Sequence, residues 1–223
     1  MHRWISCFAL VMAALAIAVA GRAQEPLDLH TLALGMKRNQ EELRHYAWQS
    51  ITTYHVNGVQ RRRMVYRISY DSQGMMVKVQ QSGTTAKEKL RGPDGKKLKK
   101  EQIEAAYEFA LDVRSQLTGY LDPMLAEKAV RTSEVTDDGE ALLLRSTGVV
   151  TAGDVVEIRL DRATHLPLSL KADSTIGDAP VTLEVRFEAA DFGPYYPVHS
   201  VTRTAWNGLE VSITTQDSDY VKR

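Results

Sequence analysis

The sequence contains almost no cysteine and has no excess of charge. Its single cysteine, Cys7, lies close to the N-terminus, so the rest of the chain has no disulfide, no thiol nucleophile and no thiolate ligand. Its 28 Lys and Arg residues are matched by 28 Asp and Glu residues. A formal net charge of +0 supplies no general attraction to nucleic acid or to an anionic membrane. A disulfide-rich scaffold is therefore excluded, and we expect no nucleic-acid partner.

Long hydrophobic runs are also missing beyond the N-terminal segment. Arg3 precedes an apolar run from Cys7 to Ala20, and small residues at cleavage spacing follow in AVAGRAQEP. The run is about 14 residues long, which is short for a membrane span. We expect residues 1–23 to be a secretory signal peptide cleaved after Ala23, with Ala20 as the second choice and an uncleaved anchor helix as the alternative. Cys7 precedes the apolar run, so we expect no lipidated N-terminus.

The remaining residues, 24–223, have the composition of one soluble domain. Removing Arg3 and Arg22 takes Lys and Arg from 28 to 26 against 28 acidic residues, a net charge of −2. No Pro-rich or Ser-rich linker and no tandem repeat divides this part. We predict a single domain in the periplasm or outside the cell, with no transmembrane segment after signal removal.

Motifs of catalysis and metal binding are scarce. The sequence has no G-x-S-x-G, H-E-x-x-H, phosphate-binding glycine loop or C-x-x-C. No two histidines after the signal lie three or four residues apart, and His55, His165 and His199 are expected to be surface residues. Asp217 and Asp219 could share a cation, but nothing near them completes a calcium site. We predict no enzymatic activity, no cofactor and no metal; a hydrolase would need a nucleophile and base that the sequence does not pair.

Alternating apolar residues are what the sequence does contain. Helical spacing predicts helices over residues 27–46 and 101–121, and the rest alternates with period two. Asn57-Gly58 and Asn207-Gly208 predict type I′ hairpins. Three strands precede the second helix and about six follow it. The predicted fold is α+β, a curved antiparallel β-sheet of about nine strands, forming an unclosed half-barrel that wraps two helices.

One face of this sheet is too large for two helices to cover. With strands ~4.8 Å apart and helices ~10 Å wide, about half of it stays uncovered. An exposed apolar face of that size is unusual in a soluble protein. Either the sheet curls onto itself, or its concavity holds an apolar ligand. The candidate ligand-binding residues are Trp48, Tyr54, Met64, Tyr66, Ile68, Val77, Ile158, Leu168, Leu170, Leu183, Val185, Phe187 and Val211.

A basic segment lies between Lys87 and Lys100. Its seven positive residues, against two negative ones, are Lys87, Lys89, Arg91, Lys96, Lys97, Lys99 and Lys100. It is either a solvated loop leading into a helix or a contact patch for an acidic partner or lipid headgroups.

Several segments resemble a known family. LDRATHLPLSLKAD, VTLEVRFEAADFGPYYPVH and the closing DSDYVKR are similar to the periplasmic lipoprotein-carrier fold, LolA-like, which RseB-like sensor domains share. YAWQSITTYHVNG, RISYDSQG and LRGPDGKKLKK resemble an uncharacterised group of secreted bacterial proteins. The carrier resemblance implies acyl chains held inside the unclosed barrel, in outer-membrane lipid or lipoprotein handling. The expected partner is a lipid or lipoprotein acyl chain. The alternative is an envelope interaction or sensor module that binds another protein and no small ligand.

Overall fold

The computed structural model describes residues 28–86, 90–117, 120, 128–189 and 193–223. The predicted signal peptide, Lys87 and Lys89 lie outside these residues. In the described part, no helix is both long enough and apolar enough to span a membrane.

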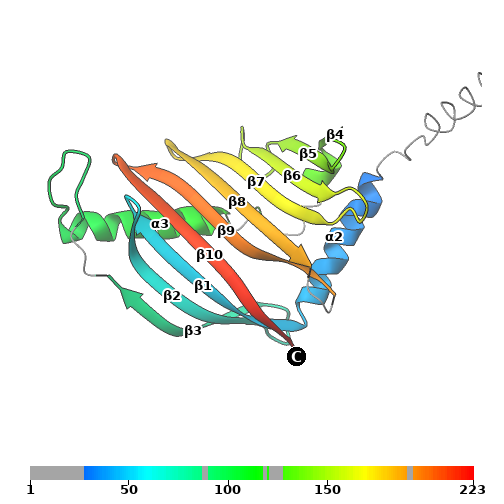
Figure 1. Cartoon of the computed structure of the whole chain (residues 1–223), viewed down its shortest axis with the longest axis horizontal. Helices are drawn as coiled ribbons and strands as arrows, with labels where there is room; N and C mark the ends of the chain where they lie inside the picture. Colours follow the sequence, from blue (N-terminus) through cyan, green and yellow to red (C-terminus); the bar gives the residue numbers. More distant parts are fainter. Residues whose placement is uncertain (1–27, 87–89, 118–119, 121–127, 190–192) are drawn as a thin grey trace, which may run out of the picture.

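The fold is one ten-stranded antiparallel sheet with helices on a single side (Figure 1). The helices are α2 (Leu29–Leu43) and α3 (Lys100–Leu117), and residues 128–131 form a short helical segment. The strands are β1 (Tyr46–Val56), β2 (Val59–Tyr70), β3 (Met76–Thr85), β4 (Glu134–Asp137), β5 (Ala141–Thr147), β6 (Val155–Asp161), β7 (Pro167–Ile176), β8 (Ala179–Ala189), β9 (Tyr195–Trp206) and β10 (Leu209–Lys222). The predicted fold class is confirmed, with ten strands where about nine were expected. β4 was missed because its four residues are all exposed and show no apolar alternation.

The strand order places the first and last strands of the sequence side by side inside the sheet. It runs β3-β2-β1-β10-β9-β8-β7-β6-β5-β4, so the C-terminal strand pairs with the first strand in sequence. Both predicted Asn-Gly hairpins form: Asn57 and Asn207 have φ of 49° and 48°, and a glycine with positive φ follows each. At the bottom of the sheet the Arg223 backbone N–H donates to the His45 carbonyl at 2.8 Å.

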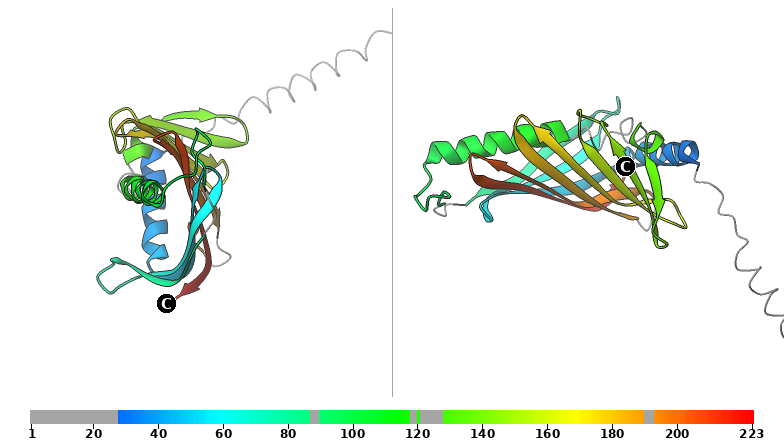
Figure 2. Two further views of the ribbon diagram at one scale, coloured as in Figure 1. Left: turned by 90° about the vertical axis from the view of Figure 1, so that its left-hand side faces the viewer. Right: turned by 90° about the horizontal axis from the view of Figure 1, so that it is seen from above.

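The sheet curves around the helices, as the two side views show (Figure 2). Asp28 caps α2, accepting the His30 backbone N–H at 3.0 Å. α3 buries a stripe of Ala106, Ala110, Val113 and Leu117 against the concave face. Small side chains in this stripe let the helix lie close to the strands.

The buried apolar residues form two clusters. The first lies over β5 to β8 and includes Leu144, Ile158, Leu170, Leu183 and Val185. The second lies over β1 and β10, beneath the N-terminal half of α3, and includes Tyr54, Val211 and Ile213. α3 contributes to both clusters, with Ala106 and Ala110 in the second and Val113 and Leu117 in the first.

Candidate functional site

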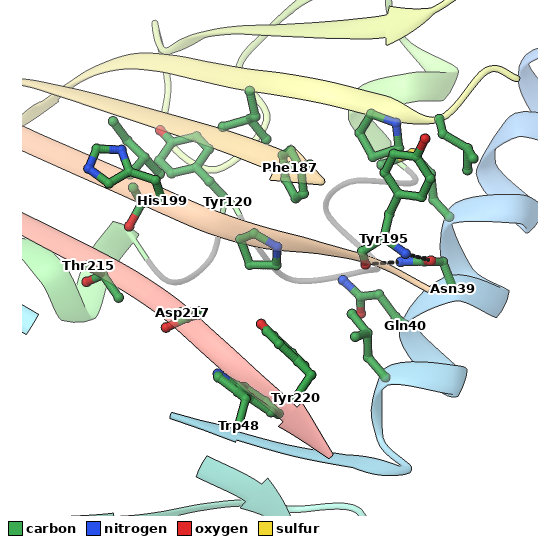
Figure 3. Close-up of a pocket in the computed structure, with 18 of the residues that line it drawn as sticks. Asn39, Gln40, Trp48, Tyr120, Phe187, Tyr195, His199, Thr215, Asp217 and Tyr220 are labelled. Carbon is green, nitrogen blue, oxygen red and sulfur yellow. Dashed lines mark hydrogen bonds between the residues drawn. The ribbon is translucent and has the colours of Figure 1, made fainter. Parts of the chain in front are cut away.

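A cavity of about 940 Å³ opens on the concave face, between α2, the C-terminal half of α3 and the sheet (Figure 3). Residues on one face of α2 line it at helical spacing: Asp28, Thr31, Leu32, Gly35, Met36, Asn39, Gln40 and Leu43. Opposite them, apolar lining comes from Leu170, Leu183 and Phe187 on β7 and β8. The cavity therefore has one wall of helix and one apolar wall of sheet.

The floor of the cavity is polar, which the alternation of apolar residues did not predict. Ser50 and Asp217 are directly opposite each other on β1 and β10, and Thr52 is opposite Thr215. Ser50 and Thr52 are 1% and 0% exposed. These positions continue the inward-facing series of Tyr54 and Ile213 toward the C-terminal end of β10. The concave face thus changes from apolar to polar along each of these strands.

Asp217 is the acidic group of this floor. Burial raises its pKa to about 6, against the opposing influence of Ser50, Arg114, Trp48 and Lys78. Its Oδ1 is buried without a hydrogen-bond partner, and so is the indole N–H of Trp48. Trp48 is 7% exposed and stacks on Tyr220, with ring centroids 5.4 Å apart. Figure 3 shows Trp48, Asp217 and Tyr220 together at the edge of the cavity.

Two basic side chains lie near this acid. Arg114 of α3 lines the cavity and donates from one nitrogen to Thr52 Oγ1 at 3.0 Å and to Tyr54 Oη at 3.3 Å. Lys78 of β3 places its ammonium 3.8 Å from the centroid of the Tyr66 ring. Desolvation and the Arg114 charge lower the pKa of Lys78 to about 8. Arg114 and Asp217 therefore both line the cavity, whereas Lys78 is exposed on β3 and acts on Asp217 from outside the lining.

Asn39 fastens α2 to the sheet at the edge of the cavity. Its side chain donates to the Tyr195 carbonyl at 2.8 Å and accepts the Tyr195 backbone N–H at 2.6 Å. Figure 3 shows this pair between α2 and β9. One amide side chain thus replaces the strand partner that the Tyr195 backbone lacks on this side.

The candidate ligand-binding residues divide between cavity and core. Those that line the cavity are Trp48, Ile68, Leu170, Leu183 and Phe187, of which Leu170 and Leu183 also belong to the first core cluster. Those that pack against the protein's own core instead are Tyr54, Met64, Ile158, Val185 and Val211. The ring of Tyr66 makes a cation–π contact with the Lys78 ammonium. Leu168 is half-buried on β7 and does not line the cavity.

Two expectations about the direction of side chains are corrected. Val77 pairs with Ser69 on the opposite face from Ile68, and it is 37% exposed there. The inward positions of β3 are Met76 and Lys78, because the register is set by β2 and not by the apolar residues of β3. His199 borders the cavity, although its alternation predicted a surface residue and its partners on β8 and β10, Arg186 and Gln216, are exposed.

His165 lies at the tip of the β6–β7 hairpin, as expected. Its φ is 57°, and Asp161 accepts the backbone N–H groups of Ala163 and Thr164 within the same turn. The turn also borders the cavity. Asp217 and Asp219 do not form a pair, since Asp217 lies in the floor and Asp219 is exposed with a φ of 54°. Among the described residues no group of three His, Cys, Asp or Glu side chains could hold a metal.

The described part of the basic segment forms a small hairpin beside the N-terminus of α3. Leu90 and Leu98 are buried in the second core cluster, and Leu98 N–H donates to the Leu90 carbonyl at 2.9 Å. The five described basic residues, Arg91, Lys96, Lys97, Lys99 and Lys100, are all exposed. The hairpin is therefore anchored by its leucines and presents its charges at the end of the molecule away from the cavity.

Known proteins are similar to this chain only in fold. No family model matches the sequence, and no curated protein matches it. A DUF1329 family protein from Desulfovibrio piger has a TM-score of 0.46 at 11% identity, over 87% of this chain and 91% of that one. An outer membrane lipoprotein-sorting protein domain from Vibrio parahaemolyticus has 0.45 at 10%, over 86% and 91%. A LolA superfamily protein from Nitrosomonas europaea has 0.41 at 13%, over 86% and 93%.

The fold and the site together define a class of protein. It is an α+β half-barrel with one unclosed antiparallel sheet, helices on the concave side and a cavity between them. The LolA-like fold expected from the sequence is represented among the similar structures, at the level of chain arrangement alone.

Proposed function

We propose that this protein binds a lipid or another apolar ligand in the cavity between α2 and the concave face of the sheet, without catalysing a reaction. The cavity itself is the observation on which the proposal depends. Its volume of about 940 Å³ is at the upper end of the range typical of small-molecule sites. The apolar wall of Leu170, Leu183 and Phe187 offers an acyl chain a surface to bury. Each Å² of apolar area removed from water contributes about 25 cal/mol.

The proposed location is the periplasm or the extracellular space, and it rests on the signal peptide that the sequence predicts for residues 1–23. A ligand-binding protein in this compartment would carry lipid or a lipoprotein acyl chain between membranes, where such ligands are otherwise insoluble. The shape and polarity of the cavity support binding of an acyl ligand. Transport of that ligand between membranes is part of the same proposal.

Plugging the cavity from α2 tests the proposal. Gly35 lines the cavity, and a Cβ added there meets no atom within 4 Å. Gly35→Trp would project a large apolar side chain into the space that the ligand needs, and it would also replace a poor helix former. Lys37→Trp is the matched control, because Lys37 is exposed on α2 and does not line the cavity.

The measurement is extraction and mass spectrometry of lipid from protein purified out of its native compartment. We expect the parent chain and Lys37→Trp to carry an acyl species, and Gly35→Trp to retain about tenfold less, which corresponds to about 1.4 kcal/mol of lost binding. Equal amounts of bound lipid in the two tryptophan variants, or none in the parent chain, would contradict the proposal.

The exposed basic hairpin favours a second candidate, an envelope interaction or sensor module. Arg91, Lys96, Lys97, Lys99 and Lys100 suit contact with an acidic protein surface or with lipid headgroups. Absence of extractable lipid, together with a stoichiometric protein partner lost when these lysines are reversed in charge, would favour this candidate over the carrier.

A further inference from the structure

This inference rests on the proposed function and concerns the head group of the ligand. Among the described residues, two polar atoms at the cavity floor are buried without a hydrogen-bond partner, Trp48 Nε1 and Asp217 Oδ1. Trp48 and Ser50 come close enough to affect the titration of Asp217, yet neither forms a hydrogen bond of acceptable geometry with Oδ1. A donor and an acceptor therefore lie side by side at the cavity floor with unused capacity. Leaving such groups unpaired costs about 1–3 kcal/mol each.

The charges around this pair restrict what could complete it. Arg114 on α3 and Lys78 on β3 both act electrostatically on Asp217, and its own charge opposes theirs. A cationic head group would face Arg114, whose guanidinium is held in place by Thr52 and Tyr54. An anionic head group would face the Asp217 carboxylate at close range. The hydroxyls of Tyr70 and Tyr220 carry no compensating charge at neutral pH, because burial raises the pKa of both.

We propose that the cavity selects an amphiphile with an uncharged, hydroxyl-bearing head group. One hydroxyl accepts a hydrogen bond from Trp48 Nε1 and donates one to Asp217 Oδ1, so it completes both groups at once. The apolar chain then lies along Leu170, Leu183 and Phe187. The polar head group therefore meets the polar part of the cavity lining, and the apolar chain meets the apolar part.

A set of ligands with one common chain tests the proposal. Glycerol monolaurate, methyl laurate, laurate and dodecylamine are titrated against the full mature chain in which the probe N-phenyl-1-naphthylamine occupies the cavity, and probe fluorescence is followed. At about pH 8 we expect glycerol monolaurate to displace the probe at about tenfold lower concentration than methyl laurate, the value of one hydrogen bond to a charged group. Laurate and dodecylamine are both expected to bind more weakly than glycerol monolaurate.

Two variants and a matched control test whether the preference for glycerol monolaurate over methyl laurate depends on Trp48 and Asp217. Trp48→Phe removes the N–H and keeps the stacking on Tyr220, and Asp217→Asn removes the charge of the acceptor. For each ligand we compare the concentration that displaces the probe. In each variant we expect the ratio of the methyl laurate concentration to the glycerol monolaurate concentration to fall at least threefold. The methyl laurate concentration itself should not change. Asp219→Asn makes the same chemical change two residues away at an exposed position, and the ratio should stay at the parent value.

The possible results separate this inference from the function on which it rests. If all neutral ligands bind but the hydroxyl gives no advantage, or if laurate binds tightest, the head-group inference is wrong and the cavity remains a binding site. If neither the probe nor any ligand binds the parent chain, the proposed function fails as well. Loss of the preference in Asp219→Asn would show that it does not depend on the pair.

Discussion

Two buried aspartates show how residue environment sets the charge of the same side chain. Asp154 is 1% exposed and accepts the backbone N–H groups of Val149, Val150 and Thr151 and the Tyr120 hydroxyl. Burial works to raise its pKa, but these hydrogen bonds prevail and lower it. Asp217 has no such set of donors, so burial prevails and raises its pKa to about 6. Asp154 is therefore built to stabilise a loop, whereas Asp217 is held at a cost to stability.

Replacing Asp217 should stabilise the protein in a pH-dependent way. The pKa of Asp217 is higher in the folded state than in the unfolded state. Between about pH 4 and pH 6 the folded protein therefore binds more protons than the unfolded chain, and its stability falls as the pH rises through that interval. Asp217→Asn removes this loss. We expect it to raise the free energy of unfolding by about 2 kcal/mol at about pH 8 and to change it little at about pH 4.

Urea unfolding at these two pH values measures the difference. Asp219→Asn, at an exposed position, should show no change in stability between the same two pH values. An Asp217→Asn effect of equal size at both pH values would mean that the carboxylate is not destabilised by burial.

At the scale of elements, α2 is attached to the sheet more sparsely than α3. α3 buries four residues along its length, while α2 buries Leu32 and Ala33 near its start and depends further along on Asn39. Beyond Asn39, an exposed ion pair between Glu42 and Lys222 connects α2 to β10, at 3.1 Å. Exposed ion pairs contribute little, so the two hydrogen bonds of Asn39 are the stronger of these two attachments.

Asn39→Ala should loosen this end of α2 without unfolding the sheet. Loss of two hydrogen bonds to the Tyr195 backbone leaves a part-buried donor and acceptor unpaired, at a local cost of about 1–3 kcal/mol. We expect hydrogen exchange of the amides in residues 36–43 to accelerate by about tenfold, with β1 and β10 unchanged. Lys37→Ala is the control on the same helix. Equal exchange rates of residues 36–43 in the two variants would contradict the role of Asn39 in holding this end of α2 to the sheet.

For the whole molecule, the two core clusters are connected by the sheet and by α3, and the cavity lies beside them. The first cluster lies over β5 to β8 and the second over β1 and β10, and α3 contributes to both. A ligand between α2 and the sheet would add contacts where the protein makes few of its own. Ligand binding should therefore raise the free energy of unfolding of the whole domain.

Removing bound lipid should lower the melting temperature, and returning ligand should restore it. At a free ligand concentration about 100 times Kd, binding contributes about 2.7 kcal/mol, which shifts Tm by about 5 to 10 °C in a chain of this size. Differential scanning calorimetry of delipidated protein with and without glycerol monolaurate measures the shift. Gly35→Trp should show no ligand-dependent rise; a rise equal to that of the parent chain would place the ligand elsewhere.

Part of the candidate site was predictable from alternation, and part was not. Leu170, Leu183 and Phe187 were identified because each lies on the apolar side of an alternating strand. Asp217 could have been found by the same rule, since it continues the inward series of Val211, Ile213 and Thr215, but its carboxylate suggested a cation pair with Asp219. Arg114 could not be found in this way, because its role depends on where α3 crosses β1.

The sequence by itself determined the class of fold, the hairpins and the face to which most strand residues belong, because period-two alternation and Asn-Gly turns act locally. Only the tertiary structure decided which inward residues meet a helix and which meet the cavity, and which way Val77 points. These depend on the register between β2 and β3 and on the paths of α2 and α3 across the sheet. Such relations join residues far apart in the chain, and no local pattern encodes them.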